Sequence, residues 1–231
     1  MSAAQSRAHQ PVHPRETVAA RQTRLNRLLE ALAATYPEAH CELNFSNPLE
    51  LLVATILSAQ CTDRQVNIVT TDLFQKYRSA ADYAGTPLEV LEQDIRRIGL
   101  FRNKAKNIQA ACRALVDHHG GAVPSTMDQL TALAGVGRKT ANVVLGNAFD
   151  RHEGVVVDTH VARLSARLGL TPETNPVHIE TALMKLVPRE RWTMFSHWLI
   201  WHGRRRCSAR NPDCAGCELQ ADCPSANRAA A

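Results

Sequence analysis

Residues 133–145 read LAGVGRKTANVVL, and this stretch decides the fold. The segment before it, 126–134, has apolar residues at helical spacing, and Gly135 stands where helices commonly end on glycine. After Gly137 the apolar residues recur at helical spacing again. The stretch therefore predicts two helices joined by a tight glycine hairpin, with Lys139 in the first turn of the second helix.

Neither of the common glycine-rich nucleotide motifs fits this turn. A P-loop needs a lysine directly after a glycine, but Arg138 separates Gly137 from Lys139. The dinucleotide fingerprint needs a third glycine where Thr140 stands, and a strand before it. What remains is a turn whose backbone N–H groups open a helix, which is a sequence-independent site for phosphate.

Lys139 can have either of two roles in such a turn. The commoner role is to add positive charge at a phosphate site. The other role is that of a nucleophile, because the helix dipole, the neighbouring Arg138 and partial burial would favour the neutral amine, which can form a Schiff base. Asp158 follows the apolar residues 155–157 at a helix start and is a carboxylate that can converge with Lys139. The commoner role of such an aspartate is to cap the helix.

Composition limits the class of protein. The chain has 231 residues and a net charge of +5, which suits one large or two small domains and permits a polyanionic partner. The longest apolar run, 51–59, is too short to cross a bilayer. The first twenty residues lack the apolar centre of a secretory signal, so we expect a disordered tail over 1–16 and a cytoplasmic location.

The cysteines predict a metal site. Seven are present, and four of them crowd near the end of the chain, at Cys207, Cys214, Cys217 and Cys223. An odd number in this distribution argues against a disulfide scaffold. Only one C-x2-C pair occurs and the loops are unequal, which modestly favours a [4Fe-4S] cluster and leaves zinc open.

The rest of the chain predicts an all-α fold. No segment of four or more residues shows the alternation of apolar and polar residues that is typical of a strand. Thr126 and Gln129 have the spacing of a capping box, which marks the start of a helix. Residues 99–104 form an apolar tip followed by basic residues, which suits insertion into a base stack, although folding back into the core is the commoner fate of such a tip. The other helices are expected over 17–36, 47–57, 63–76, 87–98 and 104–118.

Together these features closely resemble the endonuclease III family, bifunctional DNA glycosylases of the helix–hairpin–helix superfamily. The resemblance runs from about Ser46 to Cys223. The motifs that carry it are LSAQ-x-TD at 57–63, IGL at 98–100, GVGRKTANVVL at 135–145, VDTH at 157–160, HWL at 197–199, HGR at 202–204 and the C-x6-C-x2-C-x5-C signature.

The resemblance implies specific site residues. Lys139 matches the catalytic lysine, Asp158 matches the catalytic aspartate, and the four C-terminal cysteines match the ligands of a [4Fe-4S] cluster. Gln60 and Leu100 match residues that fill the gap left by a flipped nucleotide. Backbone carbonyls around 133–136 are similar to a hairpin that can hold a monovalent cation. The full set of implied DNA-binding residues is Gln60, Leu100, Gly135, Gly137, Arg138, Thr140 and His160.

The resemblance also implies the architecture, which is two helical domains with a DNA cleft between them. A six-helix domain with the helix–hairpin–helix motif would span 43–152. An iron–sulfur cluster domain would combine an N-terminal part, 17–42, with 153–231.

The implied function is base-excision repair. The enzyme would remove oxidised or damaged pyrimidines from double-stranded DNA, then nick the abasic site by β-elimination through a lysine Schiff base. We expect a nucleoid-associated monomer without a membrane partner. Lys139 is present and no glutamate occurs in 57–63, which disfavours the adenine-removing relatives. The alternatives are a glycosylase for mismatched thymine or uracil, a non-catalytic DNA-binding protein and, least favoured, an electron carrier.

Overall fold

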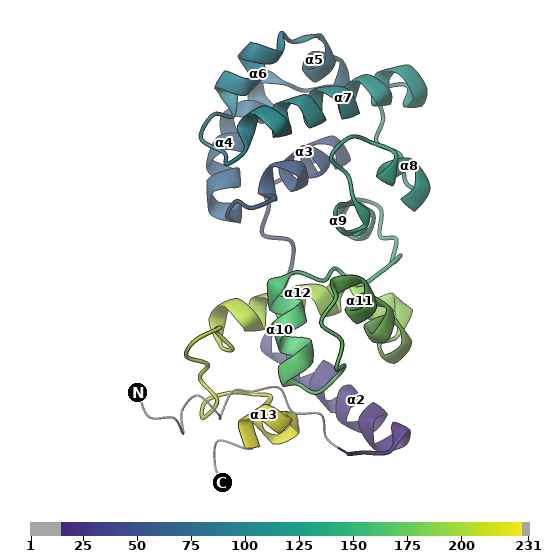
Figure 1. Cartoon of the computed structure of the whole chain (residues 1–231), viewed down its shortest axis with the longest axis vertical. Coiled ribbons are helices and arrows are strands. Elements are labelled where there is room, and N and C mark those ends of the chain that lie inside the picture. Colours follow the sequence, from purple (N-terminus) through teal and green to yellow (C-terminus); the bar gives the residue numbers. More distant parts are fainter. Residues whose placement is uncertain (1–14, 228–231) are drawn as a thin grey trace. The chain divides into compact units, whose positions relative to one another are not determined.

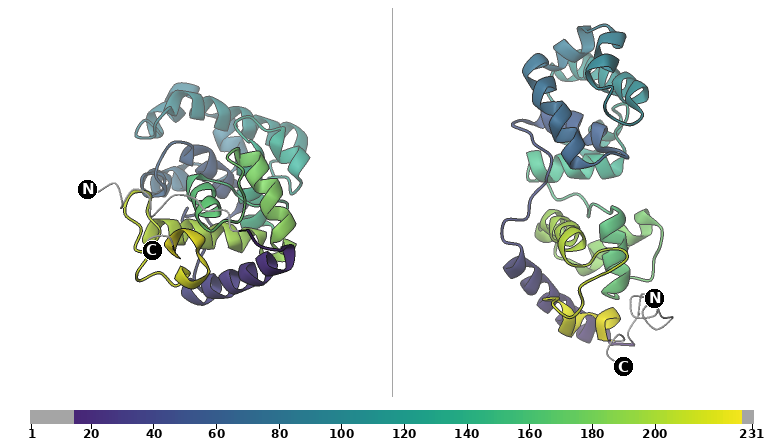
Figure 2. Two further views of the ribbon diagram at one scale, coloured as in Figure 1. Left: turned by 60° about the horizontal axis from the view of Figure 1, so that its bottom comes forward. Right: turned by 90° about the vertical axis from the view of Figure 1, so that its left-hand side faces the viewer.

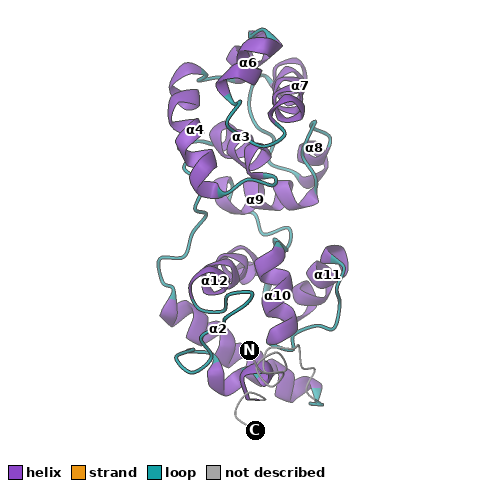
Figure 3. Cartoon of the chain, turned by 60° about the vertical axis from the view of Figure 1, so that its left-hand side comes forward, coloured by secondary structure: helices purple, strands orange, loops and turns teal. Residues whose placement is uncertain are grey.

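The computed structural model describes residues 15–227, and within them it contains helices and loops but no strand (Figures 1 and 3). The prediction of an all-α fold is confirmed. The chain divides into two compact units. The hairpin unit is Cys41–Glu153, and the terminal unit combines the described residues up to His40 with those from Gly154 onward. Most of the expected tail, 1–14, lies outside the described residues.

In the hairpin unit, α3 is the central helix and packs against α4, α7 and α9 (Figure 3). Every residue of α3 from Leu51 to Leu57 is buried, as expected for a helix with neighbours on several sides. The helices of this unit are α3 (Pro48–Ser58), α4 (Asp63–Lys76), α5 (Ala80–Gly85), α6 (Leu88–Asp94), α7 (Phe101–His119), α8 (Met127–Thr131) and α9 (Arg138–Ala148).

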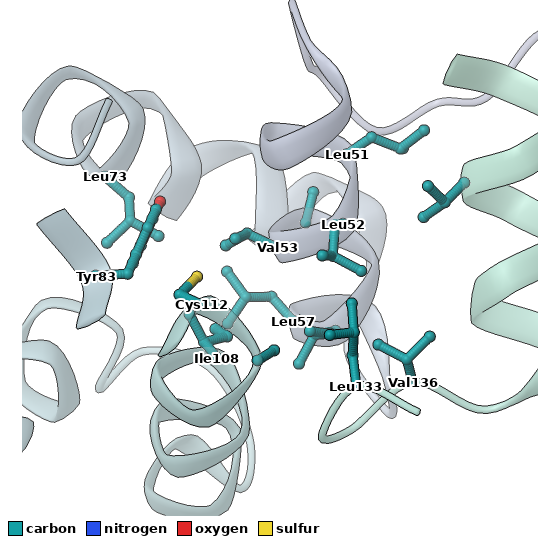
Figure 4. Packing of buried hydrophobic residues seen from close by; sticks show 14 of the residues in the cluster. Leu51, Leu52, Val53, Leu57, Leu73, Tyr83, Ile108, Cys112, Leu133 and Val136 are labelled. Atoms are coloured by element: carbon teal, nitrogen blue, oxygen red, sulfur yellow. The ribbon is translucent and has the colours of Figure 1, made fainter. Parts of the chain in front are cut away.

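One apolar core holds these helices together and reaches the glycine hairpin. Figure 4 shows side chains from α3, α4, α5 and α7 in a single cluster, with Leu133 and Val136 of the hairpin beside those of α3. Leu133 is 4% exposed and Val136 is 6% exposed. The hairpin is therefore anchored on the core through its apolar positions, while the residues between and after them stay at the surface.

In the terminal unit, α12 packs against both α10 and α2. Figure 2 shows α2 beside the last short helical segments, although the two are at opposite ends of the sequence. The helical segments here are α2 (Val18–Thr35), α10 (Thr159–Arg167), α11 (Pro176–Leu186), η1 (Arg189–Arg191), α12 (Trp192–Arg205), η2 (Gln220–Asp222) and α13 (Pro224–Asn227).

Two arginines of α2 hold the N-terminal helix on the C-terminal segment. Arg24 is buried, pairs with Glu16 at 2.6 Å and donates to the carbonyls of Leu168 at 2.7 Å and of Asp222 at 3.3 Å. Arg27 pairs with Asp222 at 2.5 Å. Together with the buried leucines of α2, these contacts make the two ends of the chain one folding unit.

Helix starts follow the sequence signals at some sites and depart from them at others. Asn47 caps α3 by accepting from Glu50 N at 3.0 Å, with Pro48 in the first turn, as predicted. The expected capping box at α8 does not form, because the Thr126 hydroxyl donates to the Gln129 side chain at 2.8 Å and no side chain caps the helix. None of the described helices is long and apolar enough to span a bilayer.

Candidate active site

Gly135 makes the hairpin turn possible. Its φ is +75°, a conformation that L-amino acids with a side chain rarely adopt. A Cβ at this position would lie 2.9 Å from the Cβ of Asn107 on α7. Both the backbone and the space around it therefore require glycine here.

Gly137 lies in a different environment. It is the N-cap of α9 with φ −90° and ψ 174°, which any residue can adopt, and an added Cβ would have no heavy atom within 4 Å. No side chain caps this helix end. An exposed helix start without a side-chain cap leaves first-turn N–H groups available to an approaching phosphate.

Lys139 stands in that first turn, after Arg138, and both side chains are exposed, so the partial burial expected for Lys139 is wrong. The Arg138 guanidinium donates from Nη2 to the carbonyl of Glu153, in the loop after α9, at 3.1 Å. Thr140 follows and is half-buried. Lys139 is thus an exposed residue in the first turn of α9, two positions after Gly137.

The two glycines provide a matched test. We expect Gly135→Ala to lower the free energy of unfolding by about 1–3 kcal/mol, because it combines left-handed strain with a clash. Gly137→Ala should lower it by less than about 1 kcal/mol but weaken DNA binding, since the methyl group narrows the approach to α9. Chemical denaturation and fluorescence anisotropy with duplex DNA measure the two effects. Equal losses of stability in both variants would contradict this assignment.

Gln60 and Leu100 occupy the tips of two loops, and both have left-handed backbones, with φ of 55° and 58°. Leu100 is 58% exposed, whereas Phe101 next to it packs against the core. Of the two large side chains at this apolar tip, that of Leu100 is therefore exposed to solvent and that of Phe101 packs on the core. Gln60 is also exposed, and the Gly99 position lies against its carbonyl, with 3.8 Å between an added Cβ and the Gln60 oxygen.

Lys104 does not join the basic surface that the sequence suggested. It is 4% exposed, and its ammonium donates to one main-chain carbonyl in the last turn of α3 and to another just after that helix. Burial lowers its pKa, while the nearby Cys61 acts in the opposite direction. The sequence could not reveal this, because a lysine after an exposed loop is normally solvated.

Asp158 caps α10. Its Oδ1 accepts from the backbone N–H groups of His160 and Val161, both at 2.8 Å. The residues before it are fixed as well: Val155 and Val157 are buried, and Val156 N donates to Ser196 Oγ at 3.0 Å. Asp158 therefore does cap the helix, which is the commoner role of such an aspartate. The same two hydrogen bonds hold the carboxylate in one position, and its second oxygen is not needed for the cap.

His160 packs closely against α12. A Cβ on Gly203 would lie 2.9 Å from its Nδ1, and Arg163 Nη2 is 3.1 Å from the same nitrogen. Burial lowers the pKa of His160, and the charges of Arg163 and Arg204 act in the same direction while Asp158 opposes them. We expect a neutral imidazole at pH 7 with little freedom to move.

The four C-terminal cysteines line one small hollow, with about 20 Å³ of cavity volume, that is partly open to solvent. Within the described residues, no three His, Cys, Asp or Glu side chains are placed to hold a single metal ion. A zinc ion would need its sulfur ligands roughly 3.8 Å apart, given Zn–S bonds of about 2.3 Å in a tetrahedron.

The surroundings of these sulfurs oppose ionisation of the free thiols but offer hydrogen-bond donors to the sulfur atoms. Burial raises the pKa of Cys214, of Cys223 and of Cys217, the last to about 11, and neighbouring sulfurs add to the rise. Only a strongly cationic group would keep all of them ionised at pH 7. Hydrogen-bond donors are in place, since Arg167 Nη1 lies 3.1 Å from Cys207 Sγ and Leu219 N lies 3.4 Å from Cys217 Sγ.

A buried histidine adds a third donor. Burial lowers the pKa of His202 to about 4, so its imidazole is neutral at pH 7. Tyr36 Oη lies 2.9 Å from its Nδ1, and its Nε2 lies 3.5 Å from Cys217 Sγ. If the tyrosine donates to Nδ1, the proton resides on Nε2 and points at the sulfur, the arrangement usual for groups behind a metal ligand.

The comparisons with known proteins agree with one another. The family model for HhH-GPD superfamily base excision DNA repair proteins matches residues 53–189. Endonuclease III of Synechocystis sp. is 52% identical over 209 residues, covering 90% of this chain and 95% of that protein. The chain belongs to the endonuclease III family.

Solved structures of the family match the fold as well. A non-covalent endonuclease III–DNA complex superposes with a TM-score of 0.84 at 48% identity, covering 90% of this chain and 97% of that chain. A trapped endonuclease III–DNA covalent intermediate, the estranged-adenine complex, gives a TM-score of 0.85 at 47% identity, with coverages of 91% and 99%.

The site residues that the endonuclease III resemblance implies are divided between the two units of the chain. The hairpin unit holds Gln60, Leu100 and the segment 135–140, and it brings the two loop tips next to each other. The terminal unit holds Asp158, His160 and the four cysteines. Within the terminal unit, α10 connects Asp158 at its start with Arg167 at its end.

Arg167 is the main residue that the sequence reading missed. It is buried and donates to Cys207 Sγ and to the carbonyls of Ser208 and Ala209, both at 2.8 Å. Its own carbonyl accepts from Ser225 Oγ at 2.7 Å. No spacing signal marks this residue, since a basic side chain in the last turn of a helix is ordinarily solvent-exposed.

Proposed function

We propose that this endonuclease III family member removes damaged pyrimidines from double-stranded DNA and cuts the resulting abasic site with Lys139. The observation that carries the proposal is an exposed lysine in the first turn of α9, directly after the uncapped glycine turn at Gly137. A phosphate bound at that turn would bring the sugar of a neighbouring nucleotide towards the amine. The hairpin unit and the terminal unit would be the six-helix domain and the cluster domain of the family.

The first step is extrusion of the damaged nucleotide, because an atom inside the stack cannot be reached. Gln60 and Leu100 would enter the space that it leaves. Their exposure and their position on two adjacent loop tips support this role. The remaining proposed DNA contacts come from the hairpin and the start of α9, with Arg138, Thr140 and His160 as side-chain contributors.

The chemical step follows at the sugar. Lys139 Nζ attacks C1′, and the base departs with the electron pair of the glycosidic bond. Loss of the amine proton and opening of the sugar ring leave an imine between Nζ and C1′. The imine acidifies the C2′ protons, and removal of one expels the 3′ phosphate by β-elimination. The Asp158 carboxylate would stabilise positive charge on the sugar and move protons.

The four cysteines, Cys207, Cys214, Cys217 and Cys223, would hold a [4Fe-4S] cluster. The cluster would supply the positive charge that keeps four half-buried thiols ionised and would fix the loop that contacts the end of α10. The carbonyls of Leu133 to Val136 would in addition accept a monovalent cation at the hairpin.

Metal analysis tests the cysteine assignment. We expect about four irons and four sulfides per chain, with broad visible absorption. Cys217→Ser should lower iron content and the melting temperature together, whereas Cys41→Ser, at a cysteine outside the site, should change neither. A colourless wild-type protein with one zinc per chain would overturn the iron–sulfur assignment.

A panel of defined lesions tests the substrate class. Duplexes carrying an oxidised pyrimidine, uracil, a mismatched thymine or an adenine mispair would be scored separately for base release and for strand nicking. We expect base release to be greatest for the oxidised pyrimidine, with nicking in the same reaction. Release confined to uracil or mismatched thymine would favour the alternative specificity.

We further propose that the enzyme acts as a monomer at the nucleoid, in the cytoplasm.

A further inference from the structure

Lys104 links the two loops that carry Gln60 and Leu100. Its Nζ donates to the carbonyl of Leu57 at 2.8 Å and to that of Ala59 at 2.5 Å. Lys104 itself lies in the first turn of α7, where its backbone N–H makes the ordinary helical bond to the carbonyl of the N-cap Leu100 at 3.1 Å. One buried residue thus bonds the end of α3 and the start of α7, directly beside both exposed tips.

The position suits an ammonium group for a physical reason. The last carbonyls of a helix lack partners within it and carry the negative end of its dipole, so a cation is favourable there. Burying an ammonium is otherwise unfavourable unless its protons find acceptors. Ser58 O already accepts from Cys61 N at 3.0 Å, and Lys104 supplies donors for the carbonyls on either side of it.

The tips need such support. Gln60 and Leu100 are not glycines, yet both have positive φ, a conformation that persists only when the surroundings impose it. Leu100 also begins α7 without a side-chain cap. The Gly99 backbone lies against the Gln60 carbonyl, so displacement of one loop would displace the other.

We propose that Lys104 is a positioning residue that holds Gln60 and Leu100 together as one paired wedge for nucleotide extrusion. The inference rests on the proposed function, and it assigns to Lys104 an effect on extrusion but none on the chemistry at the sugar. Without the ammonium, the two loops would sample other backbone conformations, and the free energy available to separate the bases would fall.

The test is Lys104→Met, which keeps most of the side-chain volume but removes the donors, with Lys106→Met at an exposed position of the same helix as the matched control. On a duplex with one thymine glycol, we expect single-turnover base release by Lys104→Met to fall about tenfold to hundredfold, the loss typical of a charge-assisted hydrogen bond. The fluorescence rise of 2-aminopurine placed beside the lesion should fall in parallel. Lys106→Met should match the wild type.

An abasic site in single-stranded DNA provides the discriminating substrate, because no base pair has to be opened. Borohydride trapping there should stay within about twofold of the wild type for Lys104→Met. In a Gln60→Ala/Leu100→Ala background, adding Lys104→Met should change duplex excision by less than about twofold, since coupled residues are not additive. Equal losses on duplex and single-stranded substrates, or full additivity, would overturn the proposal.

Two further outcomes are distinguishable. Absence of trapping by the wild-type protein would reject the proposed function rather than the role of Lys104. Should Lys104→Met fail to fold, Lys104→Gln keeps one amide donor for the carbonyls and would be measured in the same assays. Normal duplex excision by a folded Lys104→Gln or Lys104→Met variant would reject the wedge-positioning role.

Discussion

The Lys139→Gln variant should form no borohydride-stable adduct with abasic DNA, and its strand nicking should fall at least about a thousandfold, roughly 4 kcal/mol of barrier. An amide nitrogen cannot form the imine on which both the adduct and β-elimination depend. Since Lys139 is exposed and glutamine is a good helix former, the substitution should leave the fold unchanged. Gel analysis of trapped complexes and of nicked strands measures the effect.

The affinity for DNA distinguishes a nucleophilic Lys139 from a Lys139 that only binds phosphate. If Lys139 is the nucleophile, Lys139→Gln should bind a duplex containing a stable abasic analogue within about threefold of the wild type, apart from the loss of one charge. The control is Arg138→Gln, at the preceding exposed position, which should weaken binding similarly but still form the adduct. An adduct that survives in Lys139→Gln, or binding and nicking that fall in proportion, would reject the nucleophile assignment.

Much of the fold could be predicted because its helices are marked locally. Asn47 and Pro48 start α3, and the segment 63–76 was expected as a helix with the bounds that α4 has. Gly135 was expected to end a helix over 126–134, but α8 already ends at Thr131, and the positive φ of Gly135 instead forms the turn that leads into α9. These features depend on a few neighbouring residues, so sequence patterns suffice to find them.

Other elements depend on distant contacts, and sequence patterns did not find them. The short helix α5 and the helices α11 and α12 were not anticipated, and the segment 87–98 was expected to remain helical beyond Asp94, where α6 ends. The Thr126 capping spacing was present, but the hydroxyl bonds a side chain instead of the backbone. Spacing alone cannot decide between such competing acceptors.

The same division holds in the candidate site. Lys139 and Asp158 could be named from helix starts and motif spacing. The left-handed backbone at Gln60 and the burial of Lys104 could not, because both arise where two loops far apart in sequence meet. The role of Arg167 likewise depends on the loop 207–209, forty residues further along the chain. Motifs thus mark the reacting groups more readily than the residues that position them.

Helix α10 connects the proposed chemistry to the cysteine site. Asp158 caps its first turn, and Arg167 in its last turn bonds the loop that begins at Cys207. We infer that a filled cysteine site stabilises α10 and, through it, the position of the carboxylate. Removal of a group bound by these cysteines should therefore lower activity through loss of structure around Asp158.

Asp158→Asn should slow base excision about a hundredfold, roughly 2.7 kcal/mol, while the protein stays folded. Asparagine caps helices about as well as aspartate, so its side-chain oxygen can still accept from His160 N and Val161 N. The melting temperature should fall only slightly, through loss of the charge–dipole attraction. Asp158→Ala removes both roles and should lose about 1 kcal/mol of stability in addition, or about 2–4 °C.

Asn175→Ala isolates the capping contribution. Asn175 caps α11 in the same unit by accepting from Val177 N at 2.9 Å, and nothing assigns it to the chemistry. This variant should lose stability comparable to that lost by Asp158→Ala yet excise bases at the wild-type rate. If Asp158→Asn excised as fast as the wild type, Asp158 would be a helix cap alone, and the charge developing on the sugar would have to be stabilised by another group. A slow Asp158→Asn with an unchanged melting temperature instead requires the negative charge itself, which no helix cap needs.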